Sequence, residues 1–126
     1  MTQTFNIQYS AEPDVVRLFG RGTGAATSAL TSVKGKGIAS IARGGVGAHT
    51  ITLSDKYAGF LMFSACILDA TTPDDWEVLV TAETVNSTKT VAIQVFKGGT
   101  AADLSTDEKI LFELVVSKTS QKPAGF

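Results

Sequence analysis

Short segments in which apolar and polar side chains alternate place the strongest constraint on how this chain folds. In HTITL, residues 49–53, His49, Ile51 and Leu53 fall on one face of an extended chain, and Thr50 and Thr52 fall on the other. The same period of two recurs in TVAIQVF and ILFELVVS, and segments rich in Gly, Asp and Asn separate these runs. A period of two belongs to β-strands, so the sequence predicts an all-β protein, and the strand spacing is typical of an antiparallel β-sandwich.

The run FLMFSACIL, residues 60–68, is apolar at almost every position. A buried helix over residues 58–68 has the right length, but the run has no polar face and turn signals border it, so we predict a strand. One face, with Phe60, Met62, Cys66 and Leu68, is expected to fill the core. The opposite face then needs cover from outside the sandwich; it consists of Leu61, Phe63, Ala65 and Ile67.

The first 36 residues differ in character from the rest of the chain. Two apolar clusters, FNIQY and VVRLF, are separated by AEPD and followed by the small, polar stretch GRGTGAATSALTSVKGKG. We therefore predict an extended N-terminal arm over residues 1–36 and a β-sandwich domain over residues 37–126. A chain of 126 residues is long enough to bury the core of one such domain.

The charge balance bears on the class of partner. The net charge of −1 is unlike that of a basic nucleic-acid binder, so no nucleic-acid partner is expected. All three arginines, Arg17, Arg21 and Arg43, lie in the first half of the chain. They mark either a contact face for acidic groups or ordinary solvated surface. No apolar stretch reaches the length of a membrane helix and no secretion leader opens the chain, so we expect a soluble protein made in a cytoplasm, without a membrane partner.

Residues that carry chemistry are sparse. His49 and Cys66 are the only residues of their types, so a zinc site lacks ligands and a catalytic triad lacks its setting. The glycine clusters match neither phosphate-binding pattern, and turns explain them. Two groups of acids are better explained by solvated loops than by paired catalytic carboxylates. They are Asp74, Asp75 and Glu77, and Asp103, Asp107 and Glu108. We expect no enzyme activity, no cofactor and no metal.

Two stretches resemble small virion proteins of tailed bacteriophages. GVGAHTITLSDKYAGFLMFSACIL is similar to a glycine-rich turn, a T-[VI]-T-L strand and a following apolar strand in those proteins. KTVAIQVFKGGTAADLSTDEKILFELVVSKTS resembles their continuation through a T-A-A-D-L connection into the last strand. The resemblance covers about residues 37–120. His49 stands where such proteins often carry an aromatic residue.

This resemblance implies a jelly-roll sandwich and a capsid decoration (cement) protein, which binds the outer capsid surface as a homotrimer and stabilises the head. Its partner would be the major capsid protein, and it would be found on the virion surface after synthesis in the bacterial cytoplasm. The trimer interface would cover Leu61, Phe63, Ala65 and Ile67. The arm would bind the capsid through apolar anchors and two arginines; these are Phe5, Ile7, Tyr9, Val16, Arg17, Leu18 and Arg21.

An alternative role is a receptor-binding or fibre-head module of a phage tail. In that role Trp76 would stack on a glycan, although a buried Trp at a strand edge explains the residue as well. A hydrolase that uses carboxylates on a jelly roll is the third and least supported hypothesis.

Overall fold

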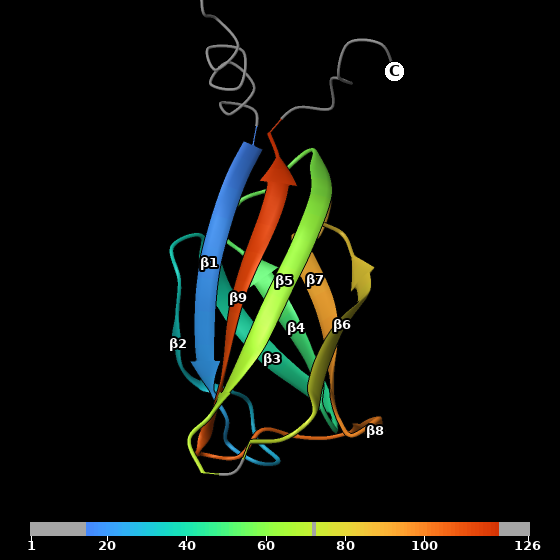
Figure 1. Ribbon diagram of the computed structural model, residues 1–126. Helices are drawn as coiled ribbons and strands as arrows, with labels where there is room; N and C mark the ends of the chain where they lie inside the picture. Colours follow the sequence, from blue (N-terminus) through green and yellow to red (C-terminus); the bar gives the residue numbers. More distant parts are fainter. Residues whose placement is uncertain (1–14, 72, 119–126) are drawn as a thin grey trace, which may run out of the picture.

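The computed structural model describes residues 15–71 and 73–118, which form strands connected by turns and loops and contain no helix (Figure 1). The strands are β1 (Val15–Thr23), β2 (Thr31–Lys34), β3 (Ile38–Gly45), β4 (Ala48–Leu53), β5 (Gly59–Asp69), β6 (Trp76–Glu83), β7 (Thr90–Lys97), β8 (Thr100–Ala101) and β9 (Glu108–Ser117).

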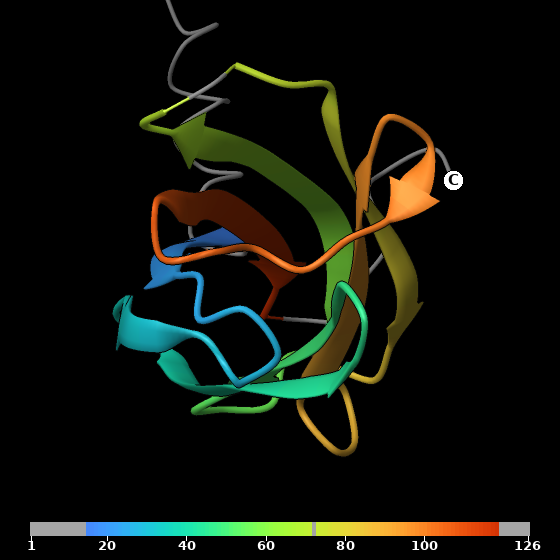
Figure 2. The same ribbon diagram turned by 90° about the horizontal axis from the view of Figure 1, so that it is seen from below.

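The strands form two sheets in which every pairing is antiparallel. Sheet A has the order β2-β1-β9-β5, and sheet B has the order β3-β4-β7-β6, with the short β8 paired to β7. The two sheets pack face to face around one core (Figure 2). The prediction of an all-β antiparallel sandwich is confirmed.

The core is built from the alternating positions of β4, β7 and β9. On β4, His49, Ile51 and Leu53 are buried while Thr50 and Thr52 are half-buried, as the period of two predicts. The other buried residues of these strands include Val91, Ile93, Val95, Ile110, Phe112, Leu114 and Val116. Each such aliphatic side chain contributes about 1.5–3 kcal/mol when it leaves water, so these three strands provide much of the stability.

Residues 15–36 belong to the sandwich and not to an arm, so the predicted boundary at residue 36 is wrong. Along its whole length β1 pairs with β9, from Val15 opposite Ser117 to Thr23 opposite Lys109, and β2 extends the same sheet. The side chain of Leu18 is 6% exposed and lies in the core. The physical reason is that β9 is a central, apolar strand whose backbone groups need partners on both sides, and β1 supplies one of them. Residues 1–14 lie outside the described residues.

A β-bulge reverses the predicted faces of β5. The register shifts between Phe60, which faces Val116, and Met62, which faces Val115, so Leu61 is an extra residue in the strand. Beyond the bulge, Phe63, Ala65 and Ile67 pack against the core, and the predicted outward position of these three residues is wrong.

Leu61 is exposed, as predicted, but Met62, Cys66 and Leu68 are exposed where the sequence predicted core positions. Because side chains alternate along a strand, a single inserted residue moves every later side chain to the opposite face.

A close approach at Phe112 on β9 joins the two neighbours of that strand in sheet A, β1 and β5. The Phe112 ring stacks with that of Phe63 at 5.6 Å between centroids. On its other side the ring lies against Gly20 of β1, where a Cβ atom would overlap it. Glycine at this position therefore makes room for the largest side chain of the core.

Candidate binding surface

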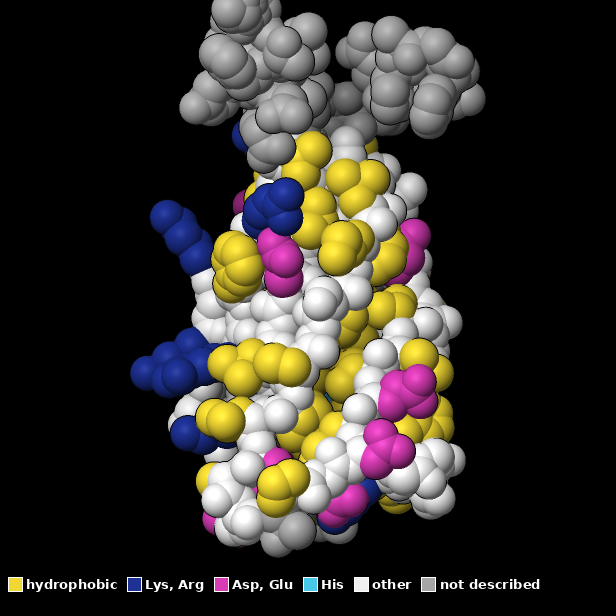
Figure 3. Space-filling view, in the orientation of Figure 1, with side chains coloured by type: hydrophobic (Ala, Val, Ile, Leu, Met, Phe, Trp, Pro, Cys, Tyr) yellow, Lys and Arg dark blue, Asp and Glu magenta, His cyan; other side chains and the backbone are white. Residues whose placement is uncertain are grey.

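The outer face of sheet A carries a group of exposed apolar side chains. The strand registers place outward residues in cross-strand rows, such as Phe19–Glu113–Ser64 and, one row further along, Arg21–Leu111–Cys66. We call the apolar members of this face the outer patch; they are Phe19, Leu61, Met62, Cys66, Leu68 and Leu111. Figure 3 shows apolar side chains spread over this face, interrupted by a few charged ones.

The members of the outer patch are unusually accessible for large apolar residues. Phe19 is 62% exposed, and Leu61, Met62 and Leu68 are each at least 50% exposed. Single exposed apolar residues are common on soluble proteins, whereas several on one sheet face mark a surface that contacts a partner.

Two shallow hollows flank Phe19 and give the patch relief. The one towards β5 has a volume of about 250 Å³ and is lined by Ser64, Cys66, Leu111 and Glu113. The one towards β2 has a volume of about 260 Å³ and includes Arg21 and Lys34. Phe19 thus protrudes between two depressions, and a partner with a complementary surface could pack side chains into both of them.

The charges on this face are unevenly distributed. Arg17 Nη1 donates to Glu113 Oε2 at 2.9 Å, which places an ion pair within the apolar surroundings. Arg21 and Lys34 face each other across β1 and β2, and neither forms an ion pair within residues 15–71 and 73–118. The face is therefore basic along the β1–β2 side and apolar along β5.

The predicted arm residues divide into three groups. Arg17 and Arg21 are exposed on β1, as a contact role requires. Val16 packs against the core and Leu18 is buried, so neither can anchor the chain to a partner. Phe5, Ile7 and Tyr9 lie outside the described residues.

Of the outer patch, only Leu61 was predicted to contact a partner: Met62, Cys66 and Leu68 were predicted to lie in the core, and Phe19 and Leu111 were not singled out. The signal for Phe19 was present, because Arg17, Phe19 and Arg21 alternate with Leu18 and Gly20 as residues on the outer face of a strand do. Leu111 shares its face of β9 with Lys109 and Glu113, and only the sheet order shows that it lies between Arg21 and Cys66.

His49 is a core residue. Its side chain is 3% exposed, and neither ring nitrogen has a hydrogen-bond partner. Burial is the main cause that lowers the pKa of the ring, with Asp103 acting in the opposite direction and Arg43 in the same direction. The ring therefore packs in the core and does not reach the surface, where a substrate could meet it.

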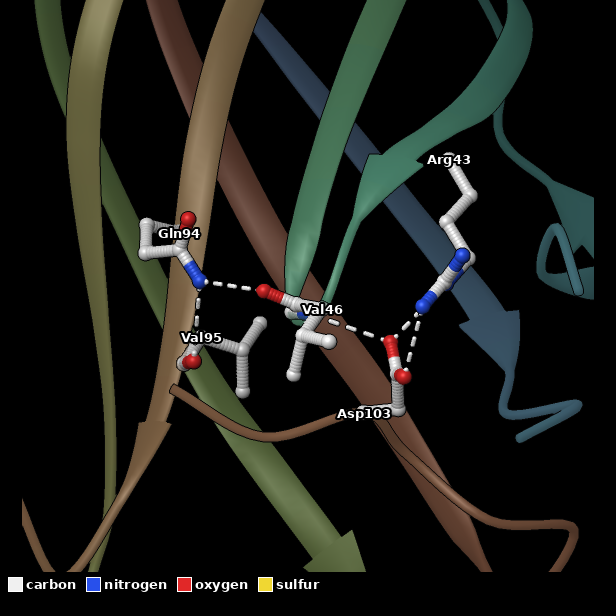
Figure 4. A network of polar contacts seen from close by, with 6 residues as sticks. Arg43, Val46, Gln94, Val95 and Asp103 are labelled. Atoms are coloured by element: carbon white, nitrogen blue, oxygen red, sulfur yellow. Dashed lines mark hydrogen bonds and ion pairs between the residues drawn. The ribbon is translucent and has the colours of Figure 1, made fainter. Parts of the chain in front are cut away.

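A polar network ties the β3–β4 turn to the chain that follows β8 (Figure 4). Arg43 donates to both carboxylate oxygens of Asp103, at 3.0 and 2.8 Å, and the backbone N–H of Gly47 donates to the same carboxylate at 2.9 Å. The hydrogen bond from Arg43 is the main cause that lowers the pKa of Asp103. Gln94 Nε2 donates to the carbonyl of Val46 at 2.8 Å. The side chains of Asp103 and Gln94 therefore fix the backbone of the β3–β4 turn.

The remaining candidates for chemistry also have structural partners. Glu108 is buried and accepts the backbone N–H of Ser105 at 2.7 Å. The Trp76 indole N–H donates to Asp69 at 3.3 Å, and Lys97 covers its ring at 5.3 Å from the centroid. A covered ring offers no free face on this side for a sugar, so Trp76 lends no support to the glycan-binding alternative.

The described part of the chain, residues 15–71 and 73–118, offers neither a metal site nor a membrane helix. No group of three or more His, Cys, Asp or Glu side chains within it is placed to hold a metal ion. None of its elements is a helix long and apolar enough to cross a membrane.

Comparison with known proteins gives no relative for this chain: no family model, no curated protein and no solved structure matches it. The resemblance to phage virion proteins therefore stays a prediction, and the outer patch is the feature of the structure that bears on function.

Proposed function

We propose that this chain is a non-enzymatic structural protein of a tailed-bacteriophage head, a decoration protein that forms homotrimers and binds the major capsid protein on the outer capsid surface. The outer patch is the observation that carries the proposal. The sandwich would then be of the jelly-roll kind found in such virion proteins.

The dimensions of the patch suit an interface between subunits. Three strands of about ten residues (β1, β9 and β5) and the four-residue β2, about 4.8 Å apart and at about 3.3 Å per residue, give sheet A a flat footprint of roughly 500 Å². A standard protein interface buries about 800 Å² of accessible surface on each partner. The accessible surface of this face exceeds its flat footprint, because exposed side chains such as Phe19 and Met62 stand out from the sheet, so the face approaches the area of a standard interface.

The position of the patch also favours assembly. Its residues lie on paired strands of a packed sandwich, so little conformational entropy is lost when a partner binds. A contact between subunits through this face replaces the one that the sequence analysis assigned to Phe63, Ala65 and Ile67, which the core already covers.

The basic side of the same face is suited to the capsid. Arg21 and Lys34 lie side by side at the β1–β2 edge, beyond the apolar part. Arginine and lysine are well suited to contacts with carboxylates, so an acidic strip on the capsid protein would complement this edge.

The first experiment measures the native mass of the full chain by light scattering after size exclusion. We expect a mass near three times that of the 13.2 kDa chain. The double variant Met62→Asp, Leu68→Asp should be monomeric, because burying a carboxylate in an apolar contact is costly. The matched control is Leu79→Asp on the outer face of sheet B, where Leu79 is 46% exposed. A monomeric wild-type chain would refute the trimer.

The second experiment measures co-sedimentation with heads of the phage that encodes the chain, prepared without this protein. We expect saturable binding that weakens strongly in the variant Arg21→Glu, Lys34→Glu, which reverses two charges without touching the apolar part. Trimers that form normally and fail to bind these heads would contradict the decoration role while leaving the assembly intact.

A further inference from the structure

On one side of the sandwich the two sheets end in long strands that are paired, among the described residues, along one edge only. Sheet A ends at β5 and sheet B ends at β6, and within residues 15–71 and 73–118 no strand pairs with the outer edge of either. The two strands lie next to each other in space (Figure 1). Apolar side chains are visible along the gap between them in Figure 3.

Side chains that face the core on this side are incompletely covered. Val80 of β6 lies opposite the buried Ile93 and shares its inward face, yet it is 36% exposed. Phe63, Ala65 and Ile67 of β5 are inward as well and only half-buried. By contrast, the apolar inward residues of the central strands β7 and β9 are 0–5% exposed. The core therefore lacks cover along the β5–β6 side.

Apart from the bulge at Leu61, the edge of β5 lacks the features that keep exposed strands from pairing. From Gly59 to Leu68 it contains no charged residue and no proline. Soluble proteins usually protect a long edge strand with charges, prolines or a covering segment. The regular, uncharged edge that follows the bulge, residues 62–68, thus favours cover by another strand.

The chain itself contains a segment of the required pattern. In TFNIQY, residues 4–9, Phe5, Ile7 and Tyr9 alternate with Asn6 and Gln8. A strand of this kind has one apolar and one polar face. Placed beside β5, it would present three apolar side chains to the uncovered core and two amides to solvent.

We propose that residues 4–9 of the same chain add to the free edge of β5 as an antiparallel strand and cover the β5–β6 side of the sandwich. Sheet A then has five strands, and the apolar side chains of the segment cover Phe63, Ile67 and Val80. In this proposal Phe5, Ile7 and Tyr9 pack against the core of their own chain and do not make the capsid contacts that the sequence had led us to expect.

The connection is long enough for the same chain to reach this edge. Val15 and Gly59 both lie opposite Ser117, so β1 and β5 begin at the same end of sheet A. The new strand would lie three strand spacings from β1, about 14 Å. The six steps from Tyr9 to Val15 span up to about 20 Å, which leaves slack for the turn.

The direction of the chain also favours β5 over β6. A segment that leads into the start of β1 runs towards the end where β5 begins, and so opposite to β5. In Figure 1 the arrowhead of β6 points to that same end, so a strand added to β6 would be parallel to it. Antiparallel pairing is slightly more stable per residue, and β5 is already part of the sheet that contains β1.

Hydrogen–deuterium exchange of the full-length protein tests the proposal. The amides of β5 that point away from β9 should exchange at least tenfold faster in the double variant Phe5→Ser, Ile7→Ser than in the wild type. Exchange in β4 and β7 should stay the same, which also shows that the variant folds. The matched control Asn6→Ser, Gln8→Ser changes the polar face only and should keep the wild-type protection.

A cross-link distinguishes two arrangements: residues 4–9 paired with β5 of the same chain, and residues 4–9 paired with β5 of another copy. Asn6→Cys in the added strand would share the outward face with Cys66 of β5, which is exposed. A short bismaleimide should join the two thiols within one chain, seen as a product of monomer mass on a denaturing gel. A product of dimer mass, or β5 exchange that Phe5→Ser, Ile7→Ser leaves unchanged, overturns the proposal. Neither result depends on whether the protein binds a capsid.

Discussion

The buried imidazole of His49 leads to a sharp prediction about stability and pH. Its side chain is 3% exposed, and both ring nitrogens lack partners, so burial lowers the pKa of the ring from its ordinary value of 6.5. The unfolded chain therefore binds a proton in a pH range in which the folded chain does not. The free energy of unfolding should be greatest above about pH 6.5 and fall as the pH decreases from there to the pKa of the folded state.

The size of the effect follows from a single proton. Each pH unit within the window costs about 1.4 kcal/mol, so the decrease from pH 6.5 to 5.0 is up to about 2 kcal/mol. His49 is the only histidine of the chain, and no other side chain has an ordinary pKa in this range. A domain of ordinary stability, about 5–15 kcal/mol, would show this loss clearly.

Urea unfolding followed by the fluorescence of Trp76, at pH values from 5.0 to 7.5, measures the slope. The variant His49→Leu should remove most of it and raise stability at pH 7 by about 1–3 kcal/mol, because two unsatisfied nitrogens leave the core. The control Ile51→Val, on the same face of β4, should lower stability by about 0.5–1.5 kcal/mol and keep the slope. A wild-type curve that is flat between pH 5.0 and 6.5, or a slope that persists in His49→Leu, would refute the reasoning.

Two further predictions concern packing and the polar network. Gly20→Ala should destabilise the fold by about 1–3 kcal/mol in urea unfolding, because the new methyl group overlaps the Phe112 ring; Gly59→Ala, whose Cβ would meet its nearest atom at 3.9 Å, is the neutral control. Asp103→Asn should lower the melting temperature at pH 7, where the wild-type carboxylate is ionised and paired with Arg43. Since this pairing lowers the pKa of Asp103 below 3.8, its stabilisation is lost as the pH falls through the lowered value, and calorimetry should show the two proteins converge there. Equal melting temperatures at pH 7 would contradict this role of the ion pair.

Sequence patterns predicted the strands of the sandwich where one face was apolar and the other polar. The alternation in residues 49–53 identified the buried face of β4 correctly, because burial on one side of a sheet demands that period. The same logic failed for residues 60–68, since a run that is apolar on both faces contains no information about which face is inward. The bulge at Leu61 then decided the outcome, and its position depends on pairing with β9.

The candidate surface was harder to predict than the fold. Arg17 and Arg21 were identified as contact residues, but as part of an arm and not of a strand. Arg21 lies in a stretch rich in glycine and small residues, a composition typical of loops. The sequence does not show that β9 pairs with this stretch, and so a loop was predicted. Strand β1 is stable because β9 lies beside it, a contact between residues about a hundred positions apart.

The sequence by itself determined that the chain is built of strands and which faces of β4, β7 and β9 are buried, because the alternation of side chains along a strand is a local property. The tertiary structure alone decided which strands neighbour each other, and hence that Phe19, Leu111 and Met62 share one exposed face. It also decided that β5 and β6 end their sheets on the same side. Such features arise from pairing between distant segments, and no pattern within one segment records the identity of its neighbour.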